Sequence, residues 1–211
     1  MNPNFRSKNK APKRRSQAEN REYRRASLLK AAIATVARHD IEGATVERIC
    51  SQAGASRGLI AHYFDSKESL LLAALENWFH TALEIKTHIA QDTTLSAEQR
   101  IREIAYSSVS PPSYSWEIAS AWQAFTNASR HNPAYAKPIR DASRYATRLI
   151  APLFAQAAED LGIEIDAEAA AMGLYILDDG LWNSLATGKD KLTLTKARAC
   201  CDRYIDGCLI G

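Results

Sequence analysis

The stretch GASRGLIAHYF, residues 54–64, carries more polar side chains than a short packed helix needs. Ile60 and Phe64 are one helical turn apart and can pack against preceding helices. Arg57 and His62 then face outward. Arginine makes bidentate hydrogen bonds to guanine or grips a phosphate, while tyrosine and lysine bind phosphate oxygens. This combination predicts a DNA-reading helix; the alternative is the solvated face of an ordinary helical hairpin.

Two short helices and a small-residue turn are needed to position these side chains. Thr45 has the residue type of an N-cap for the first helix, and Ser56 has it for the second. Gly54 between them tolerates the positive φ that such a turn requires. We expect a helix-turn-helix whose second helix enters the major groove with its N-terminal end first, and Gly58 leaves room for that approach. The first helix buries an apolar face made of Val46, Ile49, Cys50 and Ala53.

A second chemistry-bearing group lies in the predicted helix 167–188. Tyr175, Asp178 and Trp182 follow one line of that helix, and Asp179 is adjacent to it. Consecutive aspartates in an apolar helix are costly unless each is paired or hydrogen-bonded. The sequence therefore predicts specific partners for both carboxylates.

Two interpretations of these aspartates stay open. The structural one is an ion pair with an arginine such as Arg144 or Arg148. The functional one is a carboxylate at the edge of an aromatic cage that holds a cation. Trp122 and Phe125 of the predicted helix 113–131 have the chemistry of cage members, and their alternative is plain core packing. The predicted ligand-binding residues are Trp122, Phe125, Tyr175, Asp178 and Trp182.

Helical periodicity continues almost without interruption after the first 20 residues, and no long period-two alternation predicts a strand. We therefore expect an all-α fold. Pro138 and Pro152 fall inside one expected helix and predict a kink or a split there. The helix-turn-helix is expected to be followed by helices at about 66–90, 96–109, 113–131, 134–161, 167–188 and 192–209.

Charge is distributed unevenly along the chain. Residues 1–25 hold nine lysines and arginines against two acidic residues, whereas the whole chain has a net charge of only +3. A basic arm suggests contact with nucleic acid, and a solubilising tail is the alternative. We divide the chain into a disordered basic arm (1–20), a helix-turn-helix DNA-binding domain (21–66) and a helical ligand-binding and dimerisation domain (67–211).

Composition and motifs exclude several other classes. No apolar run is long enough to span a bilayer and the N-terminal segment does not resemble a secretory signal, so we expect a cytoplasmic protein without membrane contact. The four cysteines form no CxxC pair, so we expect no metal site and no cofactor. Motifs such as HExxH, GxSxG or a P-loop are missing, so we expect no catalytic residues and no enzyme. An architectural DNA binder without a ligand stays open, although it leaves the large C-terminal region unexplained.

A heptad pattern in the last predicted helix, from Leu194 to Cys208, predicts a self-association surface together with the apolar seam of the 167–188 helix. Packing within one chain is the alternative. The predicted homodimer interface comprises Leu177, Leu181, Leu194, Cys201 and Tyr204.

The segment TVERICSQAGASRGLIAHYFDSKESLL resembles the DNA-binding domain of the TetR family of bacterial regulators. The resemblance covers roughly residues 22–80 and rests on the Thr opening, the AG turn, the HYF close and the SKE start of the next helix. It implies a homodimer on palindromic double-stranded DNA, with repression as the common activity. By motif position it implies DNA contacts from Thr45, Ser56, Arg57, Gly58, His62, Tyr63 and Lys67.

The body resembles the choline-responsive BetI type within that family. The resemblance rests on WQAF, RHNPAY and LDDGLWNSLATG, and it departs from the pattern at Thr126 and Asn183, where bulkier residues are expected. It implies a small-molecule effector, with choline as the first candidate and control of choline and glycine-betaine metabolism as the role. An uncharged or larger hydrophobic effector is the alternative.

Overall fold

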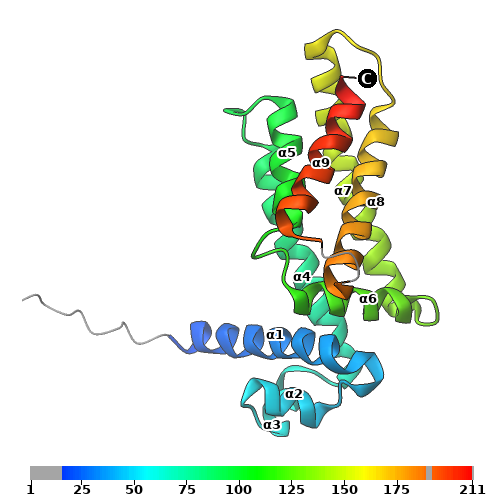
Figure 1. The fold of residues 1–211 in the computed structure, drawn as a ribbon. Helices are drawn as coiled ribbons and strands as arrows, with labels where there is room; N and C mark the ends of the chain where they lie inside the picture. The colour runs from blue at the N-terminus through cyan, green and yellow to red at the C-terminus, as the bar shows by residue number, and fades with distance from the viewer. Residues whose placement is uncertain (1–15, 189–191, 211) are drawn as a thin grey trace, which may run out of the picture.

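The computed structural model describes residues 16–188 and 192–210, and every regular element within them is an α-helix (Figure 1). This confirms the all-α prediction. None of these helices is long and apolar enough to cross a membrane. The helices are α1 (Gln17–Gly43), α2 (Val46–Ala53), α3 (Arg57–Tyr63), α4 (Lys67–Ala90), α5 (Ala97–Ser108), α6 (Trp116–Ser129), α7 (Pro133–Leu161), α8 (Ala167–Thr187) and α9 (Leu194–Leu209).

Local capping chemistry fixes where the N-terminal helices begin. Ser16 and Glu19 form a capping box at the start of α1, so the helix begins inside the segment that we expected to be a disordered arm. The rest of that arm, residues 1–15, lies outside the described residues. Ser66 caps α4 in the same reciprocal way with Ser69. Side-chain oxygens thus satisfy backbone N–H groups that helix geometry leaves unpaired.

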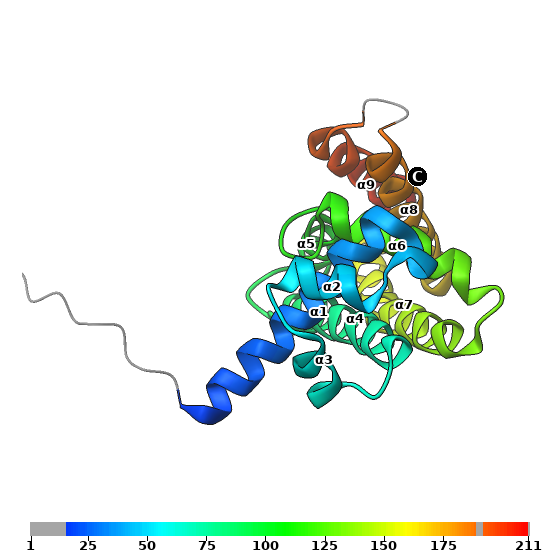
Figure 2. The ribbon, with the colours of Figure 1, turned by 90° about the horizontal axis from the view of Figure 1, so that it is seen from below.

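The helices pack around two hydrophobic cores. The first core, which we call the head core, joins α1–α3 to the first half of α4. The second, the body core, joins α5, α7, α8 and α9. Figure 1 shows α1–α3 grouped below a long bundle, with α4 rising from the head into the body, and Figure 2 shows the same arrangement from below, with the head towards the viewer.

Three helices contribute to both cores: α4, α6 and α7, which buries Tyr135 in the head core and its C-terminal half in the body core. On α4, Leu71 and Leu75 are fully buried in the head core, and Trp78, one turn further, packs against both cores. On α6, Phe125 is buried in the head core while Trp122 is buried in the body core. The head and the body are therefore joined by packed side chains as well as by the chain itself.

The C-terminal helices complete the body. α7 runs unbroken from Pro133 to Leu161 through Pro138 and Pro152, so the predicted split does not occur. α9 packs against both α5 and α8. Gly162 and Gly188 end α7 and α8 in the left-handed conformation that suits glycine.

Candidate DNA-binding and ligand-binding sites

The helix-turn-helix consists of α2 and α3. The hydroxyl of Thr45 accepts a hydrogen bond from the backbone of Arg48, and that of Ser56 accepts one from the backbone of Leu59. Gly54 ends α2 with φ of 61°. Thr45 and Ser56 therefore cap the N-termini of α2 and α3. This structural role does not prevent either residue from contacting DNA.

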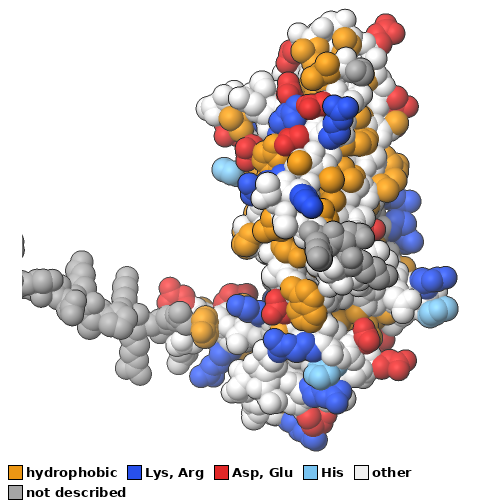
Figure 3. Space-filling view, viewed as in Figure 1, with side chains coloured by type: hydrophobic (Ala, Val, Ile, Leu, Met, Phe, Trp, Pro, Cys, Tyr) orange, Lys and Arg blue, Asp and Glu red, His pale blue; other side chains and the backbone are white. Residues whose placement is uncertain are grey.

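The outer face of α3 presents Arg57, Gly58 and His62 to solvent. The Arg57 guanidinium forms an ion pair with Glu47 of α2 at 2.6 Å. A Cβ added at Gly58 would meet only the Ser56 hydroxyl, at 3.9 Å, so the space in front of this residue is open. Figure 3 shows charged and histidine side chains gathered over this end of the molecule.

Tyr63 and Lys67 bond to the protein itself. The Tyr63 hydroxyl donates to the backbone oxygen of Arg21 at 3.2 Å, which ties α3 to α1. The Lys67 ammonium donates to the backbone oxygen of Ile41 at 3.0 Å and to that of Glu42 at 3.5 Å, so it covers the C-terminal end of α1. Phosphate contacts from these two side chains would have to share or replace these bonds.

The body contains a cavity of about 80 Å³ between α4, α6, α7 and α8. Trp78 packs against two other indoles of the cavity wall. Its ring centroid is 5.7 Å from that of Trp122 and 5.2 Å from that of Trp182. The ring of Phe79 also belongs to this aromatic cluster, with its centroid 5.8 Å from that of Trp122. The remaining lining residues are Ala82, Leu83, Lys86, Ser108, Ser113, Ala142, Ala146, Tyr175, Asp178 and Asp179.

Hydrogen bonds hold two of the three indoles in place. Trp122 donates to the carboxylate of Asp179, and Trp182 donates to the backbone oxygen of Ser108 at 2.9 Å. The indole N–H of Trp78 is buried and has no hydrogen-bond partner among the residues that the structure describes. Buried polar atoms are nearly always hydrogen-bonded, so this donor points to a ligand group or a water in the cavity.

The two aspartates of α8 have different partners. Asp178 lies 3.6 Å from the ammonium of Lys86 on α4, and its other carboxylate oxygen is buried with no hydrogen bond in the described part of the chain. Burial raises the pKa of Asp178, and the charge of Lys86 opposes that rise. The ion-pair partner is therefore Lys86 rather than the expected arginines of α7. The cavity is lined by one basic side chain, Lys86, and by two acidic ones, Asp178 and Asp179. A cationic ligand would therefore balance the charge of its lining.

The structure brings together most, but not all, of the predicted ligand-binding residues. Trp122, Tyr175, Asp178 and Trp182 line the cavity. Phe125 does not: it is 1% exposed and packs on Tyr135 in the head core. Phe125 is only three residues after Trp122, but α6 lies between the two cores, so the two rings point into different ones.

Sequence reasoning missed the contribution of α4. Trp78, Ala82 and Lys86 follow one face of that helix at four-residue spacing and form one wall of the cavity. The sequence signal that could have identified this wall was the presence of Trp78 and Lys86 on an otherwise apolar face of the helix. Asp179 was noted beside Asp178, but its role as the Trp122 acceptor depends on how α6 and α8 pack.

The predicted dimer surface divides into buried and exposed parts. Leu181 and Cys201 are buried in the core of their own chain, so their burial needs no second copy. Leu177 and Tyr204 are partly buried against the same core, and Leu194 is exposed. Met172 and Ile176 of α8 are 52% and 61% exposed, so the available apolar face is turned away from the predicted seam. Figure 3 shows hydrophobic side chains over α8 and α9.

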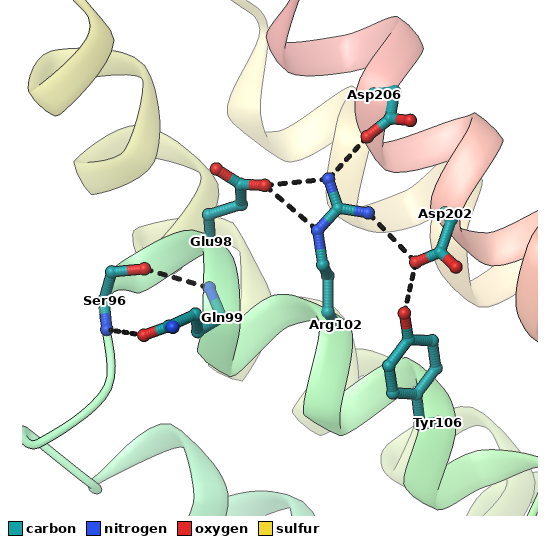
Figure 4. A network of polar contacts seen from close by, with 7 residues as sticks. All are labelled: Ser96, Glu98, Gln99, Arg102, Tyr106, Asp202 and Asp206. Carbon is teal, nitrogen blue, oxygen red and sulfur yellow. Dashed lines mark hydrogen bonds and ion pairs between the residues drawn. The ribbon is translucent and has the colours of Figure 1, made fainter.

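A polar network fixes α9 against α5 (Figure 4). The guanidinium of Arg102 on α5 bonds to Glu98 of its own helix and to Asp202 and Asp206 of α9. The hydroxyl of Tyr106 also donates to Asp202. This network lies outside the cavity and sets the position of the helix that borders the exposed apolar face.

Comparisons with known proteins agree with both halves of this arrangement. Residues 28–74 match the family model for bacterial regulatory proteins of the tetR family. Residues 97–210 match the model for the C-terminal domain of BetI-type transcriptional repressors. The chain belongs to the TetR family of transcriptional regulators, which act as DNA-binding dimers that respond to small-molecule effectors. Within that family its body is of the BetI type.

Individual relatives support the same assignment. The HTH-type transcriptional regulators BetI of Paraburkholderia phymatum and Burkholderia mallei are each 29% identical over 186 residues, which covers 88% of this chain and 93% of theirs. A putative regulator from Pseudomonas aeruginosa has a TM-score of 0.77 and 29% identity, covering 90% of this chain and 92% of that one. A regulator from Saccharomonospora viridis, solved in complex with choline, has a TM-score of 0.76 and 24% identity, with 88% and 96% covered. These relatives are regulators rather than enzymes, in agreement with the absence of a catalytic motif.

Proposed function

We propose that this protein is a repressor that binds a palindromic operator as a homodimer and is released by choline or a closely related quaternary ammonium compound. The observation that carries the proposal is the cavity. Three indoles and two carboxylates surround it, and one buried donor and one buried acceptor in it have no partner within residues 16–188 and 192–210. Aromatic faces and a nearby carboxylate are what a quaternary ammonium requires, because that group cannot donate hydrogen bonds.

The unpartnered atoms narrow the ligand further. The indole N–H of Trp78 needs an acceptor, and the free carboxylate oxygen of Asp178 needs a donor. A hydroxyl group supplies both, so a hydroxylated quaternary ammonium such as choline satisfies both atoms. A carboxylate in the same place would satisfy Trp78 but would be repelled by Asp178 and Asp179. We therefore expect choline to bind more tightly than glycine betaine.

An uncharged or hydrophobic effector is the second candidate, and the Lys86–Asp178 ion pair favours it because one carboxylate is already neutralised. The cavity volume of about 80 Å³ argues against a long chain. A structural neighbour from Bacillus subtilis was solved with stearoyl-CoA, but at 15% identity it shares the fold alone.

Helix α4 would couple ligand binding to release of the operator. Trp78 and Phe79 line the cavity, while Leu71 and Leu75 of the same helix are buried in the head core. A ligand that favours one position of Trp78 therefore favours one position of the head. The ligand must bind the two states unequally, since equal binding shifts no equilibrium.

Titration calorimetry on the whole chain tests the effector. Asp179→Asn removes one negative charge and keeps the side-chain shape, so choline affinity should fall about tenfold, as for the loss of a charge-assisted contact. Trp116→Phe is the control because Trp116 lies outside the cavity and donates to the backbone of Ala186. A lack of heat with millimolar choline, or equal affinity in both variants, contradicts the proposed site.

DNA binding is tested separately by enriching sites from a random duplex library. We expect an inverted repeat bound by two protomers, and Arg57→Ala should weaken it by about 1–3 kcal/mol if Arg57 reads a base. Added choline should lower the affinity for the enriched site. Choline that binds without any effect on DNA affinity contradicts release and leaves the ligand site standing.

A further inference from the structure

An acidic side chain stands on the face of the head that carries the proposed recognition helix. Glu47 belongs to the first turn of α2, and its carboxylate contacts the guanidinium of Arg57 on α3 at 2.6 Å. Both side chains are exposed, Glu47 by 54% and Arg57 by 72%. An ion pair this exposed contributes little to stability, so its position on this face needs another explanation.

The surroundings of the Glu47 carboxylate favour its charged form. The backbone N–H of Glu47, the hydroxyl of Thr45 and the charge of Arg57 all lower the pKa of Glu47, so it is ionised at neutral pH. It lies at the N-terminal end of a helix, where the macrodipole favours a negative charge. Glu47 thus presents a charged carboxylate to Arg57, whose longer side chain has more rotatable bonds.

A flexible arginine loses side-chain freedom when it binds a base. Its long side chain has many rotamers, and a partner that holds it in place reduces the conformational entropy that is lost on binding. Glu47 engages one terminal nitrogen of Arg57, and no other hydrogen bond of this guanidinium is found in the described part of the chain. The remaining donors are free for a bidentate contact with the O6 and N7 atoms of guanine.

The carboxylate of Glu47 also weakens the attraction of the head to DNA in general. An acidic group near the phosphates opposes the electrostatic attraction that drives non-specific binding. Glu47 therefore affects the two components of DNA binding in opposite directions: it weakens binding to any duplex and supports the reading of one base pair.

We propose that Glu47 is a positioning residue that orients Arg57 toward a guanine and thereby sets the base preference at one position of each half-site. This inference rests on the proposed role of α3 as the recognition helix. It assigns a specificity role to a side chain of α2, a helix for which the sequence predicted only an apolar face, with a cap and a DNA contact from Thr45 just before it.

The test measures base discrimination at every position of the sequence that the wild-type dimer enriches from random duplex DNA. Arg57→Ala identifies the position that Arg57 reads, where discrimination should fall about tenfold or more. Glu47→Ala should lower discrimination several-fold at that position alone and raise affinity for unrelated DNA. In the Arg57→Ala background, the same Glu47 change should leave base preference unaltered.

Glu42→Ala is the matched control. It removes the same charge from the head, and the carboxylate of Glu42 takes part in none of the ion pairs found among the described residues. It should leave base discrimination intact. Glu47→Gln provides a second variant that keeps the side-chain shape, and circular dichroism confirms that each variant is folded.

Three results overturn the inference. In the first, discrimination at the Arg57 position is unchanged in Glu47→Ala; in the second, every position weakens equally in Glu47→Ala and Glu42→Ala. Alternatively, Arg57→Ala lowers affinity uniformly, which means that Arg57 holds a phosphate. If the wild-type protein enriches no sequence, the proposed DNA-binding function fails, and this inference fails with it.

Discussion

The contact between α8 and α9 makes the substitution Gly173→Ala informative, because local and tertiary effects predict opposite signs. A Cβ built on Gly173 would lie 2.0 Å from the hydroxyl oxygen of Tyr204 and 2.8 Å from the ring carbon that bears it. That hydroxyl donates to the backbone oxygen of Ala170 at 2.9 Å. The Tyr204 side chain therefore has to move if residue 173 gains a methyl group.

The magnitude follows from three terms. Replacing glycine by alanine inside a helix stabilises it by about 1 kcal/mol. Displacing Tyr204 loses a hydrogen bond worth about 1 kcal/mol, and forcing extra volume into a packed contact costs about 1–3 kcal/mol. We expect a net loss of about 1–3 kcal/mol in the free energy of unfolding. The melting temperature should fall by roughly 2–4 °C for each kcal/mol.

The assay is urea unfolding followed by circular dichroism at matched protomer concentrations, since dimerisation contributes to apparent stability. Gly180→Ala on the same helix is the control, because a Cβ there meets nothing within 4 Å. Tyr204→Phe removes the nearest atom, so the double variant should be less destabilised than the sum of the single changes. If Gly173→Ala matches or exceeds the wild type in stability, the steric reasoning is refuted.

Three further changes test other parts of the structure. Lys86→Met leaves the buried carboxylate of Asp178 without its cation and should cost about 3–5 kcal/mol at alkaline pH. Because the folded-state pKa of Asp178 is raised, this loss should shrink as the pH falls below that pKa, which urea titrations at several pH values will check. Ile176→Asp places a charge on the exposed apolar face of α8 and should yield monomers in sedimentation if that face joins the dimer. Arg102→Met removes the shared partner of three carboxylates and should cost about 1 kcal/mol at low salt and less at high salt, measured by thermal unfolding.

Local chemistry explains why the helix-turn-helix was predictable from sequence. Thr45, Gly54 and Ser56 act within three or four residues of their own positions, so their roles are visible without the fold. The same holds for Tyr175, Asp178 and Trp182, which share one line of α8. Helical spacing was sufficient to group these residues correctly.

The rest of the cavity depended on how helices pack. Trp122 and Phe125 both suit an aromatic cage by type, but α6 lies between two cores and sends the rings in different directions. Trp78 and Lys86 reach the cavity because α4 crosses it, a relation between segments far apart in the sequence. Cys201 fits the heptad of α9, yet α5 and α8 already cover it. Periodicity identifies an apolar face, but it does not tell which partner buries that face.

The double membership of α4 and α6 gives the proposed response its physical basis. Trp78 of α4 and Trp122 of α6 meet at the cavity, while Leu75 and Phe125 of the same helices are buried in the head core. Close-packed cores move between discrete arrangements rather than deforming smoothly. A ligand that separates Trp78 from Trp122 therefore acts on two rigid helices that are both anchored in the head. Coupling between cavity and head then requires no separate relay, because the cavity walls and the head supports are the same helices.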